Sequence, residues 1–188
     1  MAETVIVYET HSWSEDNERG HSTGWHHGRL SARGREVARE VGERRRDDGI
    51  AVVLVSDLRR AVETAEIAFE GTHVPILHDW RLRECDYGDL NGQPTPIVHA
   101  AVTGVHQRYP NGESWAEAVA RVGRVIDDIA ARWTGARVLV VGHMSAYWAL
   151  EHVLGGMPME QVGRPFEWQE GWEYVVPPGG VGAAGPAR

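Results

Sequence analysis

The stretch "VIVYETHSWSEDN", residues 5–17, carries the first indication of the fold. An apolar run over residues 5–8 ends in a polar segment in which His11 stands between Thr10 and Ser12. A short apolar run bounded by polar residues is typical of a strand buried in a parallel sheet. A histidine that follows such a strand lies at the carboxyl end of the sheet, where open α/β sheets bind ligands. The stretch therefore predicts both a buried strand and a candidate site residue.

Similar apolar runs alternate with helical patterns along the chain. The expected strands are residues 4–8, 51–56 and 137–142, with a shorter one at 74–78 and an edge strand at 172–176. The expected helices are residues 31–46, 58–69, 114–133 and 146–154. This alternation predicts an α/β fold, a three-layer sandwich with a mostly parallel central sheet flanked by helices.

The composition suits one globular domain. Apolar residues make up 42% of the 188 residues, enough for a packed core. No linker divides residues 1–176, which we expect to form the domain, whereas residues 177–188, "PPGGVGAAGPAR", lack core-forming side chains and are expected to be mobile. Residues 79–113 show little periodicity and are the best candidate for a lid or substrate loop.

The charge and the cysteine content exclude several classes of protein. A net charge of -8 disfavours nucleic-acid binding, and the basic run 44–46 precedes two aspartates, as at a solvated helix end. The sequence has no apolar run long enough to span a membrane and no secretion signal at its start. The single cysteine allows no internal disulfide, so we expect a reducing, cytoplasmic setting.

Polar residues follow each of the three main strands. His11 follows the first strand, Arg59 and Arg60 follow the second, and His143 follows the third. One neutral imidazole can attack an electrophilic phosphorus, while the other and an arginine stabilise the charge on its oxygens. A carboxylic acid must still protonate the leaving group, and Glu84, beyond the shorter strand, is the best candidate.

Several motifs occur in a characteristic order. They are "THS" (10–12) with Asn17, "STGW" (22–25), "GRLSARG" (28–34), "SDLRRAVETAEIA" (56–68), "LRECDYGDLNG" (82–92), "PNGESWAEAVARV" (110–122) and "VLVVGHMSAYWAL" (138–150). Over residues 4–176 the chain resembles the histidine phosphatase superfamily, the phosphoglycerate-mutase-like proteins.

This resemblance implies a role for each matching residue. His11 would be the nucleophile that forms a phosphohistidine, and Glu84 would be the general acid and base. Arg60, His143 and Asn17 would hold the phosphoryl oxygens, without a metal or cofactor. The candidate substrate contacts are Thr10, Ser12, Asn17, Thr23 and Gly24. The short segment between Glu84 and His143 favours a phosphatase over a mutase.

The first motif departs from the family pattern at two positions. The family has an arginine where this chain has Thr10, and a glycine where it has Ser12. Threonine supplies no bidentate, permanently charged donor, and losing that contact would cost about 3–5 kcal/mol in the transition state. Three compensations are open: another arginine (59, 81 or 83) takes its place, the substrate carries less negative charge, or the site has abandoned phosphate.

Two alternative functions follow from this departure. The same fold could carry out proton transfer or hydrolysis on a small metabolite without phosphate, using the same histidines and Glu84. Alternatively, the chain is a non-catalytic binding module, although it retains His11, Arg60, Glu84 and His143.

The remaining histidines and the cysteine have simpler interpretations. His21, His26 and His27 lie close together in the sequence, but their spacing does not match a metal-binding pair on a helix. We therefore expect no metal. Cys85 is interpreted as a packed thiol rather than a nucleophile.

Eight tryptophans are present, and four of them fall in loops or near strand edges. These four are Trp13, Trp25, Trp168 and Trp172. Some of them would form an apolar wall over the site, so the expected partner is a small, partly hydrophobic molecule, with phosphorylated molecules among the candidates. The acidic, tryptophan-rich surface would also permit a homodimer.

Overall fold

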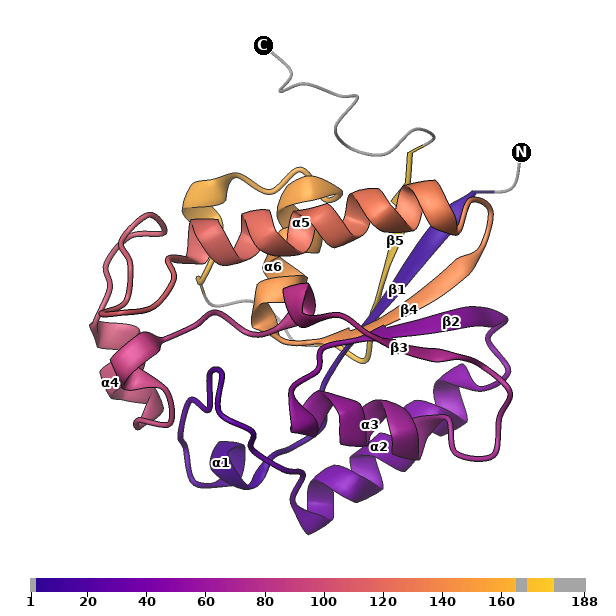
Figure 1. Ribbon diagram of the computed structural model, residues 1–188, viewed down its shortest axis with the longest axis horizontal. Helices are drawn as coiled ribbons and strands as arrows, with labels where there is room; N and C mark the ends of the chain where they lie inside the picture. Colours follow the sequence, from indigo (N-terminus) through magenta and orange to yellow (C-terminus); the bar gives the residue numbers. More distant parts are fainter. Residues whose placement is uncertain (1–2, 165–168, 178–188) are drawn as a thin grey trace.

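A five-stranded sheet forms the centre of the protein in a computed structural model that describes residues 3–164 and 169–177 (Figure 1). Its strands are β1 (Thr4–Thr10), β2 (Ile50–Val55), β3 (Ile76–His78), β4 (Arg137–Gly142) and β5 (Trp172–Val176). They lie in the order β3-β2-β4-β1-β5, and only β5 at the edge runs antiparallel to its neighbour. The predicted mostly parallel sheet is confirmed.

Helices cover both faces of the sheet (Figure 1). The longer helices are α2 (Ala32–Arg45), α3 (Arg59–Ala68), α5 (Trp115–Arg132) and α6 (Met144–Val153). The alternation of side chains along β1 shows how the layers form, because Ile6 and Tyr8 pack toward α5 and α6 while Val7 packs toward α2 and α3. The predicted three-layer α/β sandwich is therefore confirmed.

The shorter elements were not predicted from the sequence. They are α1 (Glu15–Glu18), α4 (Thr95–Ala100), and the 3-10 helices η1 (Trp80–Leu82), η2 (Gly88–Leu90) and η3 (Met159–Gln161). The stretch 79–113, expected to be an aperiodic loop, contains η1, η2 and α4. It also has a small core of its own, in which Cys85 and Tyr87 pack with Val98 and Tyr109. The predicted packing of the cysteine is confirmed, and burial raises the pKa of its thiol.

The loop after β1 is fixed by the start of α2. Ser31 caps α2 by accepting the Gly34 N–H at 3.0 Å, and its own N–H donates to the Trp13 carbonyl at 3.0 Å. A Cβ atom at Gly34 would lie only 1.9 Å from the Trp13 carbonyl oxygen. The helix can approach the loop this closely because position 34 has no side chain. The loop next to His11 is thus held by direct contact with α2.

Two expectations concern the outer parts of the chain. No helix among the described residues is long and apolar enough to cross a membrane. The C-terminal stretch 178–188, expected together with Pro177 to be a mobile tail, lies outside the described residues. The domain boundary at residue 176 stays a prediction.

Candidate active site

Two histidines and one arginine meet at the carboxyl edge of the sheet. The ring centroids of His11 and His143 are 4.9 Å apart. Arg60 donates from Nε to His11 Nε2 and from Nη2 to His143 Nδ1, both at 3.2 Å. Its side chain is only 2% exposed. The structure therefore brings together three of the predicted residues from three different strand ends.

The backbone fixes the positions of these three side chains. The register of β1 and β4 pairs Thr10 with Gly142, and the next residues are the two histidines. The His11 N–H donates to the Gly142 carbonyl at 2.9 Å, and the Tyr8 hydroxyl donates to the His143 carbonyl at 2.7 Å. Arg60 lies in the first turn of α3, so the sheet and one helix determine the arrangement.

The guanidinium of Arg60 is anchored on its other side as well. It donates to the backbone carbonyls of Gly24 at 2.9 Å and His26 at 3.0 Å. Burial lowers the pKa of Arg60 to about 10, so the group remains charged at neutral pH. The loop that contains Gly24 therefore positions the arginine through its backbone.

The partners of the two imidazoles define their tautomers. His11 Nδ1 lies 2.7 Å from the Ser12 carbonyl, which can only accept, so Nδ1 carries the proton and Nε2 has a free electron pair for Arg60. His143 Nδ1 accepts from Arg60, so its Nε2–H donates to Ser56 Oγ at 2.9 Å. Burial and the positive charge of Arg60 lower the pKa of His11 to about 3, and they also lower the pKa of His143. Both imidazoles are therefore neutral at pH 7.

Glu84 lies in the same site with its carboxyl group almost fully buried. The residue is 8% exposed, and its carboxylate accepts the N–H groups of Cys85 at 2.9 Å, Met144 at 3.2 Å and Ser145 at 3.1 Å. Burial raises the pKa of Glu84 even though these N–H groups and Arg60 favour the charged form. A carboxyl group with a raised pKa is suited to donate a proton near neutral pH.

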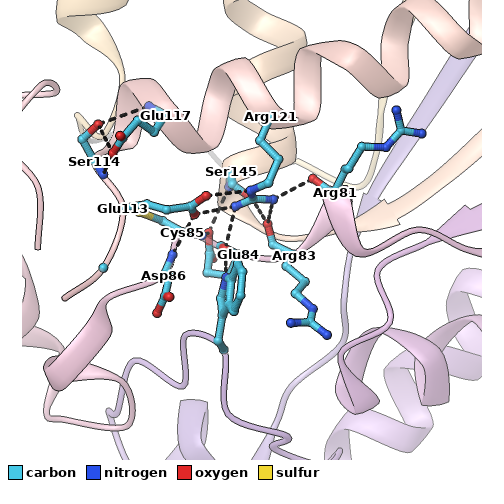
Figure 2. A network of polar contacts seen from close by, with 12 residues as sticks. Arg81, Arg83, Glu84, Cys85, Asp86, Glu113, Ser114, Glu117, Arg121 and Ser145 are labelled. Atoms are coloured by element: carbon cyan, nitrogen blue, oxygen red, sulfur yellow. Dashed lines mark hydrogen bonds and ion pairs between the residues drawn. The ribbon is translucent and has the colours of Figure 1, made fainter.

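A buried arginine of α5 holds the backbone that leads to Glu84 and the carbonyl of Glu84 itself (Figure 2). Arg121 donates to the carbonyls of Arg81, Arg83 and Glu84 at 2.7, 2.9 and 3.0 Å, and forms an ion pair with Glu113 at 2.7 Å. Sequence reasoning missed this residue. The signal was present, because position 121 lies on the apolar face of the helix, where a charged side chain requires buried partners.

Trp25 contacts the same segment. Its indole N–H donates to the Glu84 carbonyl at 2.7 Å, and the Arg83 guanidinium lies 4.8 Å from its ring centroid. The predicted apolar wall of tryptophans is thus only partly present: Trp172 is in the core, Trp13 lines the site, and Trp168 lies outside the described residues.

One cavity of about 690 Å³ contains the site. All nine residues selected from the sequence line it: Thr10, His11, Ser12, Asn17, Thr23, Gly24, Arg60, Glu84 and His143. Its volume lies within the range of ligand pockets, roughly 300–1,000 Å³. The cavity can therefore hold a small organic molecule and not only an inorganic anion.

The candidate substrate contacts differ in their surroundings. The Asn17 side-chain oxygen is occupied by the N–H and hydroxyl of Ser14, which caps α1. The Thr23 hydroxyl donates to Asp16 at 3.0 Å. By contrast, Ser12 is 4% exposed, and its hydroxyl has no hydrogen-bond partner in the described part of the chain. Within the described residues the Ser12 hydroxyl is therefore unpaired but shielded from the cavity, whereas only the side-chain oxygen of Asn17 is occupied.

Comparison with known proteins agrees with this geometry. A family model described as the histidine phosphatase superfamily (branch 1) matches residues 10–171. The chain belongs to this superfamily. The resemblance inferred from the motifs is therefore confirmed.

Relatives within the superfamily include both mutases and phosphatases. A 2,3-bisphosphoglycerate-dependent phosphoglycerate mutase of Methylobacterium radiotolerans is 35% identical over 179 residues, covering 85% of this chain and 83% of that protein. The uncharacterized phosphatase PhoE of Bacillus subtilis is 34% identical over 136 residues, covering 72% and 69%. YhfR of Bacillus stearothermophilus has a similar structure, with a TM-score of 0.84 at 27% identity over 94% of this chain and 93% of that one.

The three arginines considered as replacements for the family's first arginine are all engaged elsewhere. Arg59 donates to Glu63 at 2.8 Å, Arg81 pairs with Asp79 and Asp128, and Arg83 pairs with Asp57 at 2.6 Å. None of the three is among the residues that line the cavity. In the described structure they do not compensate for Thr10. The arginines that do line the cavity besides Arg60 are Arg33 and Arg44.

The residues considered for metal binding do not converge. No group of three or more histidine, cysteine, aspartate or glutamate side chains in residues 3–164 and 169–177 is arranged to hold a metal ion. His26 and His27 are exposed, whereas His21 makes a hydrogen bond to the Gly92 carbonyl at 2.8 Å.

Proposed function

We propose that this protein is a hydrolase of small phosphoric esters that forms a phosphohistidine on His11. The observation that carries the proposal is the state of the His11 Nε2 atom. It is unprotonated, faces Arg60, and lines the same cavity as the carboxyl group of Glu84. A neutral imidazole, an arginine and a carboxyl group that can give and take a proton are the three groups that phosphoryl transfer through a histidine requires.

The first step transfers the phosphoryl group to the protein. His11 Nε2 forms a bond to phosphorus while the bond from phosphorus to the leaving oxygen breaks. Glu84 gives its proton to that oxygen, so an alcohol departs. Arg60 stabilises the negative charge on the equatorial oxygens, because its guanidinium contacts the attacking His11 Nε2, and His143 positions Arg60 by accepting its Nη2–H at Nδ1. Asn17, which also lines the cavity, contributes its amide.

The second step returns the site to its starting state. The Glu84 carboxylate accepts a proton from water, and the oxygen of that water attacks phosphorus. The bond between phosphorus and His11 Nε2 breaks, which releases phosphate. The raised pKa of Glu84 and the lowered pKa of His11 support these roles, since one favours a proton donor and the other a neutral nucleophile.

Phosphate release from a panel of phosphoric esters tests the proposal. The wild type is compared with His11→Ala and with His73→Ala, an exposed histidine outside the cavity. We expect turnover that is lost in the first variant and retained in the second. A phosphohistidine is hydrolysed in acid, so the intermediate is sought by rapid quenching at alkaline pH. The variant used is Glu84→Gln, which lacks the carboxylate that activates water for the second step. Turnover that survives in His11→Ala would refute the phosphohistidine mechanism.

The replacement at Thr10 supports a second candidate, in which the same residues act on a small metabolite without phosphate. Among the described residues, Arg60 alone supplies a guanidinium in contact with the two histidines. Orthovanadate, which mimics the transferring phosphoryl group, distinguishes the two candidates. Binding that depends on His11 and Arg60 supports the phosphoric ester, whereas absence of binding favours the non-phosphate substrate.

A further inference from the structure

The cavity continues past Thr10 to the side of helix α2. Three consecutive residues, Glu9, Thr10 and His11, all line it. His11 faces Arg60, whereas the buried Glu9 carboxylate faces α2, where it accepts from Arg45 at 2.8 Å. The cavity therefore extends from a catalytic end at His11 to a second end beside α2, with Thr10 in its lining. We name the second end the α2 lobe and define it by Trp13, Arg33, Val37, Glu40 and Arg44.

The catalytic end offers a single positive charge to a bound phosphorus group. Both histidines are neutral, and in the described structure Arg60 is the arginine that contacts them. The two other arginines of the cavity are engaged in the lobe: Arg33 lies 4.6 Å from the Trp13 ring centroid, and Arg44 donates to Glu9 at 3.4 Å. A phosphomonoester carries about two negative charges at neutral pH. A phosphodiester carries one, which matches the one guanidinium.

The shape of the cavity provides room for the second ester group. In-line attack by His11 directs the leaving oxygen toward Glu84, so a second substituent on phosphorus must lie to the side. A threonine at position 10 is much smaller than an arginine and leaves room in the cavity, which it lines together with the α2 lobe. The lobe presents Trp13, which is 42% exposed and has Arg33 against its ring, and the half-buried Val37. These surfaces suit a flat, apolar group.

We infer that the substrate is a phosphodiester whose retained ester group passes Thr10 and occupies the α2 lobe. This inference rests on the proposed function. His11 Nε2 bonds to phosphorus, one ester bond breaks, and Glu84 protonates the departing alcohol. Water then cleaves the bond between phosphorus and nitrogen while the second ester bond stays intact. The products are one alcohol and one phosphomonoester.

Two esters with the same leaving group test the inference. They are 4-nitrophenyl phosphate, a monoester, and 4-nitrophenyl phenyl phosphate, a diester. We expect the wild type to have the higher kcat/KM with the diester. In Thr10→Arg the ratio of the two kcat/KM values should shift toward the monoester by about a hundredfold, because a charged donor is added and the passage is narrowed.

A second experiment tests whether the retained ester group occupies the α2 lobe, by varying the size of that group. The methyl ester of 4-nitrophenyl phosphate is compared with the phenyl ester in Val37→Trp, which fills the lobe. The phenyl ester should lose more activity than the methyl ester, by about tenfold. Glu36→Trp is the matched control, since this neighbouring residue on α2 is exposed and does not line the cavity. It should leave the ratio of the two esters unchanged.

The outcomes separate the inference from the proposed function. A preference for the diester that is lost in His11→Ala supports both. A preference for the monoester, lost in the same variant, overturns the inference and retains the phosphatase. Cleavage of neither ester overturns the proposed function and the inference with it. If Thr10→Arg does not fold, the wild-type preference between the two esters and the Val37→Trp comparison still test the inference.

Discussion

Replacing Arg121 by glutamine tests how the segment around Glu84 is held. The guanidinium makes five hydrogen bonds, three to the backbone carbonyls of residues 81, 83 and 84 and two to the Glu113 carboxylate. The residue is 6% exposed. Removing one partner of a buried ion pair costs about 3–5 kcal/mol, and the partial exposure of Glu113 places this case near the lower value. For a chain of this size, that loss lowers Tm by about 6–12 °C.

Activity should depend on the leaving group in the same variant. A 4-nitrophenolate leaves without protonation, whereas an alkoxide requires a proton from Glu84. A displaced Glu84 carboxyl group should therefore reduce kcat for an alkyl ester far more than for the 4-nitrophenyl ester, by an extra factor of about ten or more. Arg124→Gln is the control, because Arg124 lies on the exposed side of the same helix.

Two results would refute this reasoning. A Tm equal to that of Arg124→Gln would show that the buried ion pair with Glu113 does not stabilise the fold. Equal losses of kcat for both leaving groups, at a temperature where the variant is folded, would show that Arg121 does not position Glu84. In that case its role would be structural only.

Three further predictions follow from the contacts of the site and the loop beside it. Ser56→Ala removes the acceptor of the His143 Nε2–H, so we expect a loss of about 1 kcal/mol in the free energy of unfolding and a fall of about tenfold in kcat, measured by denaturant titration and steady-state kinetics. Gly34→Ala, whose Cβ would lie 1.9 Å from a carbonyl oxygen of the loop after β1, should lower the free energy of unfolding by about 1–3 kcal/mol. Gly123→Ala, whose nearest contact is 3.8 Å away, should raise it by about 1 kcal/mol. Equal Tm values for the two variants would contradict this. The pKa of His11 is lowered to about 3 in the folded protein, so below pH 6.5 the unfolded chain binds one proton more than the folded protein, and stability should decline as the pH falls toward 3. His11→Asn should show a smaller decline of Tm over that range. An identical decline in the two proteins would show that the imidazole is accessible to protons in the folded state.

The catalytic constellation was predictable because regular geometry determines it. Parallel strands end at a common edge, so residues that follow β1 and β4 must approach each other, as His11 and His143 do. Arg60 joins them because it lies in the first turn of the helix after β2, the other neighbour of β4. These relations depend only on strand order and on where each strand ends.

The parts that were not predicted depend on contacts between residues far apart in the sequence. Nothing near Arg81 indicates that its guanidinium reaches Asp128, 47 residues later, or that Arg121 binds the carbonyls beside Glu84. The short helices α1 and α4 have too few residues to show a helical period. The sequence therefore predicts which residues reach the site but not which charges are already neutralised there.

The separation of the two imidazoles has a consequence for how this site can change. Their centroids lie 4.9 Å apart, which is the spacing of about 4.8 Å between neighbouring strands, because each histidine directly follows one of two paired strands. The distance is thus a property of the sheet and independent of the surrounding loops. Loops can be exchanged, shortened or given new side chains without altering the paired strand ends that carry the two imidazoles. Substrate preference can therefore be redesigned in this protein while the pair of nitrogen bases stays in place.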